Sequence, residues 1–115
     1  MLNSYEIASQ LRKHIHINCK YELAEVLYNP YLQKYIIYIN KDNECYTDLQ
    51  YDCKIVEDLF LNCVQYHDKY KFYELMSESV NENLAKMNLE ELVEYYYKKG
   101  KSLAQINTII IRDER

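Results

Sequence analysis

The chain has 115 residues, a formal net charge of −4 at pH 7, and 28% charged residues against 49% hydrophobic ones. A chain of this length most simply forms one domain, and it is long enough to bury a core without metal or disulfide staples. A single glycine and a single proline exclude the glycine-rich loops that cradle phosphates, and no basic footprint indicates nonspecific nucleic-acid binding.

The first predicted element is a helix from Ser4 to about His14. Asn3 is a suitable N-cap, and Glu6 follows three residues later, as in a capping box. Apolar residues then recur at four-residue spacing and form one stripe: Ile7, Leu11 and Ile15.

A small antiparallel sheet is predicted to follow. Residues 21–28 fit a strand or a helical turn equally well. Residues 32–39 are rich in β-branched and aromatic side chains, which favours a strand. The polar turn at 40–44 leads into a partner strand at 45–47, so we expect a hairpin and two or three strands in all.

From Asp52 the apolar period becomes helical, and Asp52 is a plausible cap. The predicted buried face of this central helix carries Ile55, Val56, Leu59, Phe60, Cys63, Val64 and His67.

The last forty residues are expected to form short helices. Their predicted starts are capping-box pairs, and Gly100 is the expected left-handed stop of a helix over 89–99. A further helix is predicted from Leu103 to about Ile111, with a strand over 108–111 as the alternative. The three capping-box pairs are Ser79 with Glu82, Asn88 with Glu91, and Ser102 with Gln105.

Together these elements predict an α+β fold. We expect one domain over residues 1–115, with an α+β core over 1–76 and a helical extension over 77–115. In the core, the N-terminal and central helices would pack against the small sheet.

Negative charge is concentrated in the middle of the sequence. Residues 41–70 carry seven acidic and three basic residues, which accounts for the whole formal net charge. One interpretation is a solvated face that keeps the protein soluble. The other is a recognition surface, because carboxylates on a rigid hairpin can take the positions of phosphates opposite Arg and Lys.

Several patterns suggest chemistry but lack essential parts. His14, His16 and Cys19 lie close in sequence, and Cys63 with His67 has helical spacing, yet neither matches a common zinc site. The helix–Gly–helix at 89–111 resembles part of a helix-turn-helix but lacks a following recognition helix. We therefore expect no catalytic residues, no cofactor and no metal.

Tyrosine is unusually frequent, with fourteen residues against two phenylalanines. Tyrosine is favoured at protein interfaces, although a composition bias would produce the same count. Tyr95, Tyr96 and Tyr97 point around a helix, so at least one must be exposed. Without an export signal, the four cysteines are expected to be reduced and mostly buried, in a cytoplasmic protein.

The order of these segments resembles a family of small phage-encoded anti-CRISPR inhibitors of type II-A systems. The resemblance covers about residues 3–76: the capped helix, the strand 36–39, the turn 40–44 followed by Tyr46, the helix start at 55–57, and the segment 72–76. It implies an acidic α+β protein with a three-stranded sheet that mimics DNA at the site where the nuclease reads the motif beside its target. The implied contact residues are Asp42, Asn43 and Glu44, with Asn40 beside them.

These observations predict an inhibitor of a bacterial CRISPR-Cas effector nuclease, acting in the host bacterial cytoplasm as a monomer or dimer. Its partner would be the nuclease or its guide complex, without direct nucleic-acid or membrane binding. The expected partner-binding residues are Asn40, Asp42, Asn43, Glu44, Tyr46 and Asp48. The alternative is a non-enzymatic helical interaction or transcription-associated module over 79–111 that acts as a dimer.

Overall fold

The N-terminal helix begins at the predicted capping box. In the computed structural model, which describes residues 3–113 and the side chains of residues 3–109, helix α1 spans Ser4–His14. Asn3 Oδ1 accepts the backbone N–H of Glu6 at 2.9 Å, and Asn3 Nδ2 donates to Glu6 Oε1 at 3.2 Å. Asn3 thus caps the helix as the sequence predicts, and the Glu6 carboxylate holds the Asn3 side chain rather than its backbone N–H.

Three antiparallel strands follow in the order β1-β2-β3: β1 (Glu22–Asn29), β2 (Lys34–Lys41) and β3 (Glu44–Asp52). The ambiguous segment 21–28 therefore belongs to a strand, and the sheet has three members. The fold is α+β, as expected. Loop 30–33 joins β1 to β2, and Asn29 Oδ1 accepts the N–H groups of Tyr31 and Leu32 within it.

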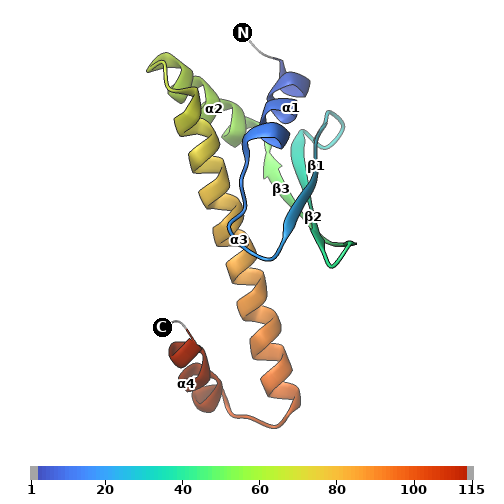
Figure 1. Ribbon diagram of the computed structural model, residues 1–115, viewed down its shortest axis with the longest axis vertical. Coiled ribbons are helices and arrows are strands. Elements are labelled where there is room, and N and C mark those ends of the chain that lie inside the picture. Colours follow the sequence, from blue (N-terminus) through green and yellow to red (C-terminus); the bar gives the residue numbers. More distant parts are fainter. Residues whose placement is uncertain (1–2, 114–115) are drawn as a thin grey trace. The chain divides into compact units, whose positions relative to one another are not determined.

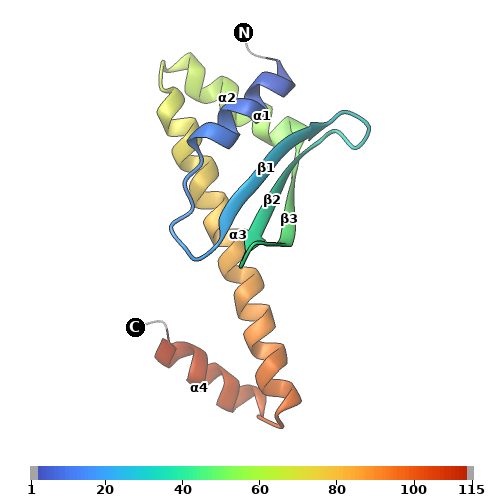
Figure 2. The same cartoon turned by 45° about the vertical axis from the view of Figure 1, so that its right-hand side comes forward.

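Most of the core lies on one side of this sheet, although Ile36 on the other side is also buried. Figures 1 and 2 show α1, α2 and the first part of α3 on the core side, with no helix over the other. The inward residues of the central strand β2 are fully buried, each with 0% exposure: Tyr35, Ile37 and Ile39. From the helices, Leu11, Val56 and Phe72 join them. Each such apolar side chain contributes about 1.5–3 kcal/mol relative to an exposed one.

Helix α2 (Cys53–Gln65) presents a narrower apolar face than predicted. Its buried residues are Val56, Phe60 and Cys63. Ile55 is 62% exposed, so its assignment to the buried face was wrong. Adjacent positions on a helix differ by about 100°, and a stripe centred on Val56 and Phe60 leaves Ile55 at its solvent side. Asp52 occupies the cap position, but its side chain makes no capping hydrogen bond.

His67 lies in the connection between α2 and the next helix and does not extend the apolar face of α2. Its φ of +57° is left-handed, and its N–H bonds to Val64 O at 2.9 Å while the N–H of Asp68 bonds to Cys63 O at 2.9 Å. These two bonds form the helix-ending arrangement usually built on glycine. Asp68 Oδ1 then accepts the N–H of Lys71 at 2.9 Å, which begins the next helix.

Helix α3 (Lys69–Lys98) is continuous, so the prediction of short helices within this region was wrong. The chain divides into two compact units, Met1–Asn81 and Glu82–Arg115, and α3 contributes residues to both. The pairs at 79/82 and 88/91 therefore lie inside a helix. Ser79 Oγ instead donates to Tyr51 Oη on β3 at 3.2 Å, within the first unit.

In the second unit, Gly100 stops α3 as predicted. Its φ is +83°, the N–H of Lys101 bonds to Tyr96 O, and the N–H of Gly100 bonds to Tyr97 O. Helix α4 (Leu103–Asp113) then begins at the capping box of Ser102 and Gln105. The strand alternative over 108–111 was wrong. No described helix combines the length and apolar character that crossing a membrane requires.

Candidate functional site

The hairpin between β2 and β3 ends in a two-residue loop. Lys41 pairs with Glu44, and Asp42 and Asn43 between them have φ values of +54° and +65°. Positive φ at both central residues identifies a type I′ turn, whose twist matches that of the flanking strands. Asp and Asn tolerate this conformation better than most residues. The predicted turn at 40–44 is thus confirmed in place, although Asn40 and Glu44 belong to the strands.

The hairpin tip carries exposed acidic side chains. Asp42, Asn43 and Glu44 are exposed, as is Asp48 farther along β3. Within the described part of the chain, no ion pair involves any of these three carboxylates. The tip therefore presents exposed carboxylates on a backbone constrained by strand pairing, and Lys20 lines the same pocket as Asp42.

Lys41, the nearest lysine in sequence, is held by aromatic rings. Its Nζ lies 5.5 Å from the centroid of the Tyr21 ring and 5.2 Å from that of Tyr46. The two rings stack with centroids 5.1 Å apart. Strand β3 has a β-bulge at Tyr46. Ile39 of β2 pairs with Thr47, and Asn40 pairs with Cys45, so Tyr46 is the extra residue between them. Half-buried Tyr46 thus supports the base of the tip.

The side of the sheet without helices carries additional carboxylates. We call this side the open face. It consists of the residues of β2 that alternate with the inward-pointing ones, together with the residues of β1 and β3 that pair directly with them. Glu25, Tyr38 and Asp48 form one row across the three strands, and Glu22 aligns with Asn40 nearer the tip. The residues of the open face are Glu22, Glu25, Leu27, Asn29, Lys34, Ile36, Tyr38, Asn40, Cys45, Asp48, Gln50 and Asp52.

Charge on the open face is predominantly negative. Its four carboxylates are exposed, whereas Lys34 is its single basic residue. Gln50 lies between opposite charges: its Nε2 donates to Asp48 Oδ2 at 3.0 Å, and its Oε1 accepts from Lys34 Nζ at 3.5 Å. The face thus continues the negative surface of the hairpin tip along the sheet. The carboxylates are Glu22, Glu25, Asp48 and Asp52.

Sequence reasoning missed Glu22 and Glu25. Both come from segment 21–28, whose conformation was ambiguous, and both lie outside the acidic stretch 42–58. Glu22 and Glu25 are three residues apart, so strict strand alternation would place them on opposite faces, and the register shift between Leu23 and Glu25 puts both on the open face. Pairing of β1 with β2 brings these carboxylates onto the same surface as Asp48.

Glu57, by contrast, does not belong to this surface. Its Oε1 accepts hydrogen bonds from Ser4 Oγ at 2.7 Å and Cys53 Sγ at 3.0 Å. These bonds, that of Cys53 first, hold the pKa of Glu57 below its ordinary value of 4.5. Through its two hydrogen bonds, Glu57 therefore ties the start of α1 to the start of α2. Burial raises the pKa of the neighbouring Tyr35 hydroxyl to about 12.

We expect the Glu57→Gln variant to lower the unfolding free energy at neutral pH by about 1 kcal/mol, since the acceptor loses its charge at a partly exposed site. In the native protein, the stabilisation from ionised Glu57 is complete above about pH 4.5 and is lost as the pH falls through its lower folded pKa. Urea unfolding from pH 7 to pH 3 measures this difference. The variant should lose less stability than wild type on acidification, whereas Asp58→Asn, at an exposed position, should follow wild type. Parallel curves for Glu57→Gln and wild type would contradict the assignment.

In the part of the chain that the structure describes, the candidate metal ligands do not assemble into a site. Among the described residues, no group of three or more His, Cys, Asp or Glu side chains could hold a metal ion. His14 stacks on Tyr73, with centroids 4.5 Å apart. All four cysteines are free, and the expectation of mostly buried thiols was wrong for Cys19 and Cys45, which are exposed.

The candidate site is therefore the hairpin tip together with the open face. The structure brings Asn40, Asp42, Asn43 and Glu44 together at the tip, and it places Asp48 on the adjoining open face. Comparison with protein-family models, with curated proteins and with solved structures finds no match for this chain.

Proposed function

We propose that this chain is a phage or mobile-element protein that inhibits a bacterial CRISPR-Cas effector nuclease by stoichiometric binding. Its acidic hairpin tip and open face would occupy a basic groove that otherwise binds nucleic acid. The observation that carries the proposal is a pair of exposed carboxylates, Asp42 within the type I′ turn and Glu44 directly after it, that form no ion pair with another described residue.

The physical basis is competition for arginine and lysine side chains. A groove that binds a phosphate backbone presents cations, and a carboxylate forms charge-assisted, often bidentate hydrogen bonds with arginine. The hairpin holds its carboxylates on paired strands, so little conformational entropy is lost when they bind. A net charge of −4 also steers the chain toward a basic surface and away from nucleic acid.

The polar and aromatic groups around the carboxylates complete the proposed surface. Asn40 and Asn43 add amide groups at the tip, and Tyr38 offers ring area in the centre of the open face. Such a mixture suits a protein interface, where aromatic anchors supply contact area and polar groups fix orientation. The inhibitor would act in the bacterial cytoplasm, without a cofactor and without catalysis.

A competition experiment tests the proposal. A purified type II-A effector nuclease loaded with guide RNA is mixed with the full chain, and labelled target DNA is added. We expect the chain to co-elute with the effector, to reduce DNA binding in proportion to its concentration, and to lose affinity as salt is raised. Unchanged DNA binding at saturating concentrations of the chain would overturn the proposal.

One observation favours the alternative, a helical module that dimerises. In the second unit, Tyr95 is 52% exposed and Tyr97 is 67% exposed, in keeping with the prediction that at least one residue of this triplet faces solvent. Light scattering on the chain alone, run beside the competition experiment, separates the two functions. Self-association with no effect on the nuclease would favour the helical module.

A further inference from the structure

The first unit contains a cavity that the proposed site does not use. It has a volume of about 540 Å³, which is within the size range of small-molecule sites. One wall is the end of α1 and the connection to β1, and the other is a single face of α3, with residues at helical spacing. Its lining residues are His14, His16 and Asn18 from the first wall, and Tyr70, Tyr73, Glu74, Ser77, Glu78 and Asn81 from the second.

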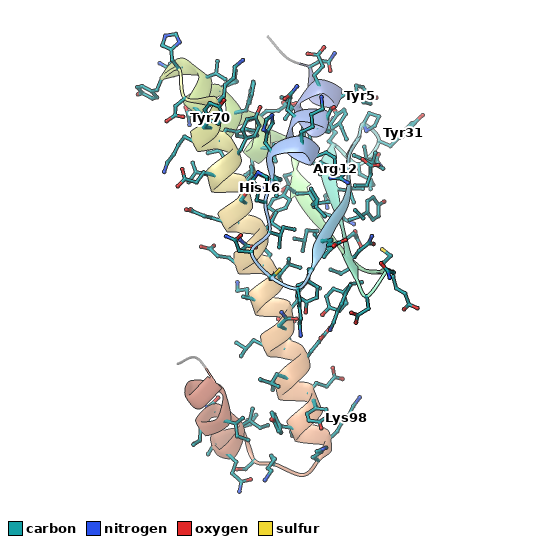
Figure 3. The ribbon with its side chains drawn as sticks, in the orientation of Figure 1. Tyr5, Arg12, His16, Tyr31, Tyr70 and Lys98 are labelled. Atoms are coloured by element: carbon teal, nitrogen blue, oxygen red, sulfur yellow. The ribbon has the colours of Figure 1, made fainter. Side chains whose placement is uncertain are left out.

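The two walls are tied together. The backbone N–H of His16 donates to Ser77 Oγ at 3.3 Å, and the His14 ring stacks on Tyr73 with an interplanar angle of 21°. Figure 3 shows His16 on the connection that runs beside α3, and Tyr70 near the beginning of that helix. The cavity is thus formed by paired segments of one unit.

Hydrogen-bond acceptors dominate the α3 wall. Glu74 and Glu78 lie one helical turn apart. Glu74 Oε2 forms an ion pair with Lys71 Nζ at 3.8 Å, whereas Glu78 has no ion pair within the described part of the chain. Asn81 Oδ1 is buried without a hydrogen-bond partner among the described residues. The accessible acceptors of this wall are therefore the two carboxylates, which favour a ligand that brings donors.

Aromatic rings accompany these acceptors. Tyr73 is buried beneath the stacked His14 ring, and Tyr70 is 79% exposed. Aromatic faces attract cations, and a planar guanidinium also stacks on them. An ammonium group of lysine offers three donors on a compact, strongly hydrated charge, while guanidinium offers five donors in a flat fork.

We propose that this cavity binds an alkylguanidinium group, the chemistry of an arginine side chain. Its planar fork would donate to Glu78 and to the neighbouring acceptors while its face lies against the aromatic wall. The group can come from an arginine of a partner protein or from free arginine. The cavity includes no residue of the hairpin tip or the open face, so this inference stands independently of the proposed function.

A titration of the full chain followed by ¹H–¹⁵N NMR tests the inference. The probes are N-acetyl-L-arginine amide, which represents protein-borne arginine, free L-arginine, and N-acetyl-L-lysine amide. We expect saturable shifts of the backbone amides of His16, Ser77 and Glu78, with an arginine probe binding about tenfold more tightly than the lysine probe. Tighter binding of the amide probe assigns a protein source, and tighter binding of free arginine assigns the amino acid itself.

Glu78→Gln should weaken arginine binding about tenfold, because it removes the unpaired charge and keeps the side-chain size. The control is Glu90→Gln, at an exposed position of α3 in the second unit, which should bind like wild type. An absence of saturable shifts, equal affinity for the lysine probe, or full affinity in Glu78→Gln would each overturn the inference.

Discussion

Replacing Asp42 by Asn and Glu44 by Lys in one variant is expected to lower affinity for the effector nuclease about 100-fold. Close charge pairs across protein interfaces contribute about 1.5 kcal/mol or more each, and a lysine opposite a basic groove adds repulsion. Asn is chosen at position 42 because φ is +54° there, and Asn accepts the left-handed region more readily than Lys does. Calorimetric titration of the effector–guide complex measures the change.

The matched control carries the same change in net charge elsewhere. Asp58→Asn combined with Glu90→Lys alters two exposed positions outside the hairpin tip and the open face. Its affinity should stay within about threefold of wild type, since distant charges are screened at physiological salt. Equal losses in both double variants would attribute binding to net charge alone and would contradict a specific role for the tip.

Substitutions on the open face distinguish a partner that contacts both the tip and the sheet from a partner that contacts the tip alone. Glu22 and Glu25 of β1 align with Asn40 and Tyr38 of β2, whereas the carboxylates of Asp42 and Glu44 lie at the tip. Glutamine at both β1 positions removes charge without altering a turn. If the partner covers the sheet as well as the tip, this variant also loses affinity; if only the tip inserts, it keeps wild-type affinity.

Ile37→Ala is expected to lower the unfolding free energy by about 3 kcal/mol. The side chain has 0% exposure on the central strand, and truncation of such a residue leaves a cavity in addition to the lost burial. Against a typical total stability of about 5–15 kcal/mol, this is a large fraction. Urea denaturation followed by circular dichroism measures it.

The control for Ile37 is Leu27→Ala on the open face. Leu27 is 48% exposed, so its truncation should change stability by less than about 1 kcal/mol. Comparable losses at both positions would show that the open face is covered in solution, for example by a second copy of the chain. That result would contradict the one-sided core and would remove the open face from the proposed binding surface.

The local ends of helices could be predicted from sequence because their interactions span only a few residues. Ser102 and Gln105 form the expected reciprocal hydrogen bonds, and Asn3 accepts the expected capping bond from the N–H of Glu6. Gly100 adopts the expected positive φ. In each case the side chain or backbone freedom that stops the helix acts on neighbours within one turn.

The same local signals misled at positions 79 and 88, where α3 continues. A capping box acts only if its first residue leaves the helical conformation. Within the first unit, Phe72, Met76 and Val80 are buried along this helix, and burial of that stripe favours continuing it through Ser79. Tertiary packing therefore overrode a valid local pattern.

The sequence by itself determined the starts of α1 and α4, the stop at Gly100, the hairpin at 40–44 and the concentration of acidic residues around it, because these depend on short-range chemistry and composition. Only the tertiary structure decided which carboxylates share a surface. Strand pairing adds Glu22 and Glu25 to the face that carries Asp48, while hydrogen bonds from Ser4 and Cys53 keep Glu57 between two helices. The physical reason is that strand register and helix packing join residues far apart in the chain, and the energy that selects them comes from burying the core on one side of the sheet.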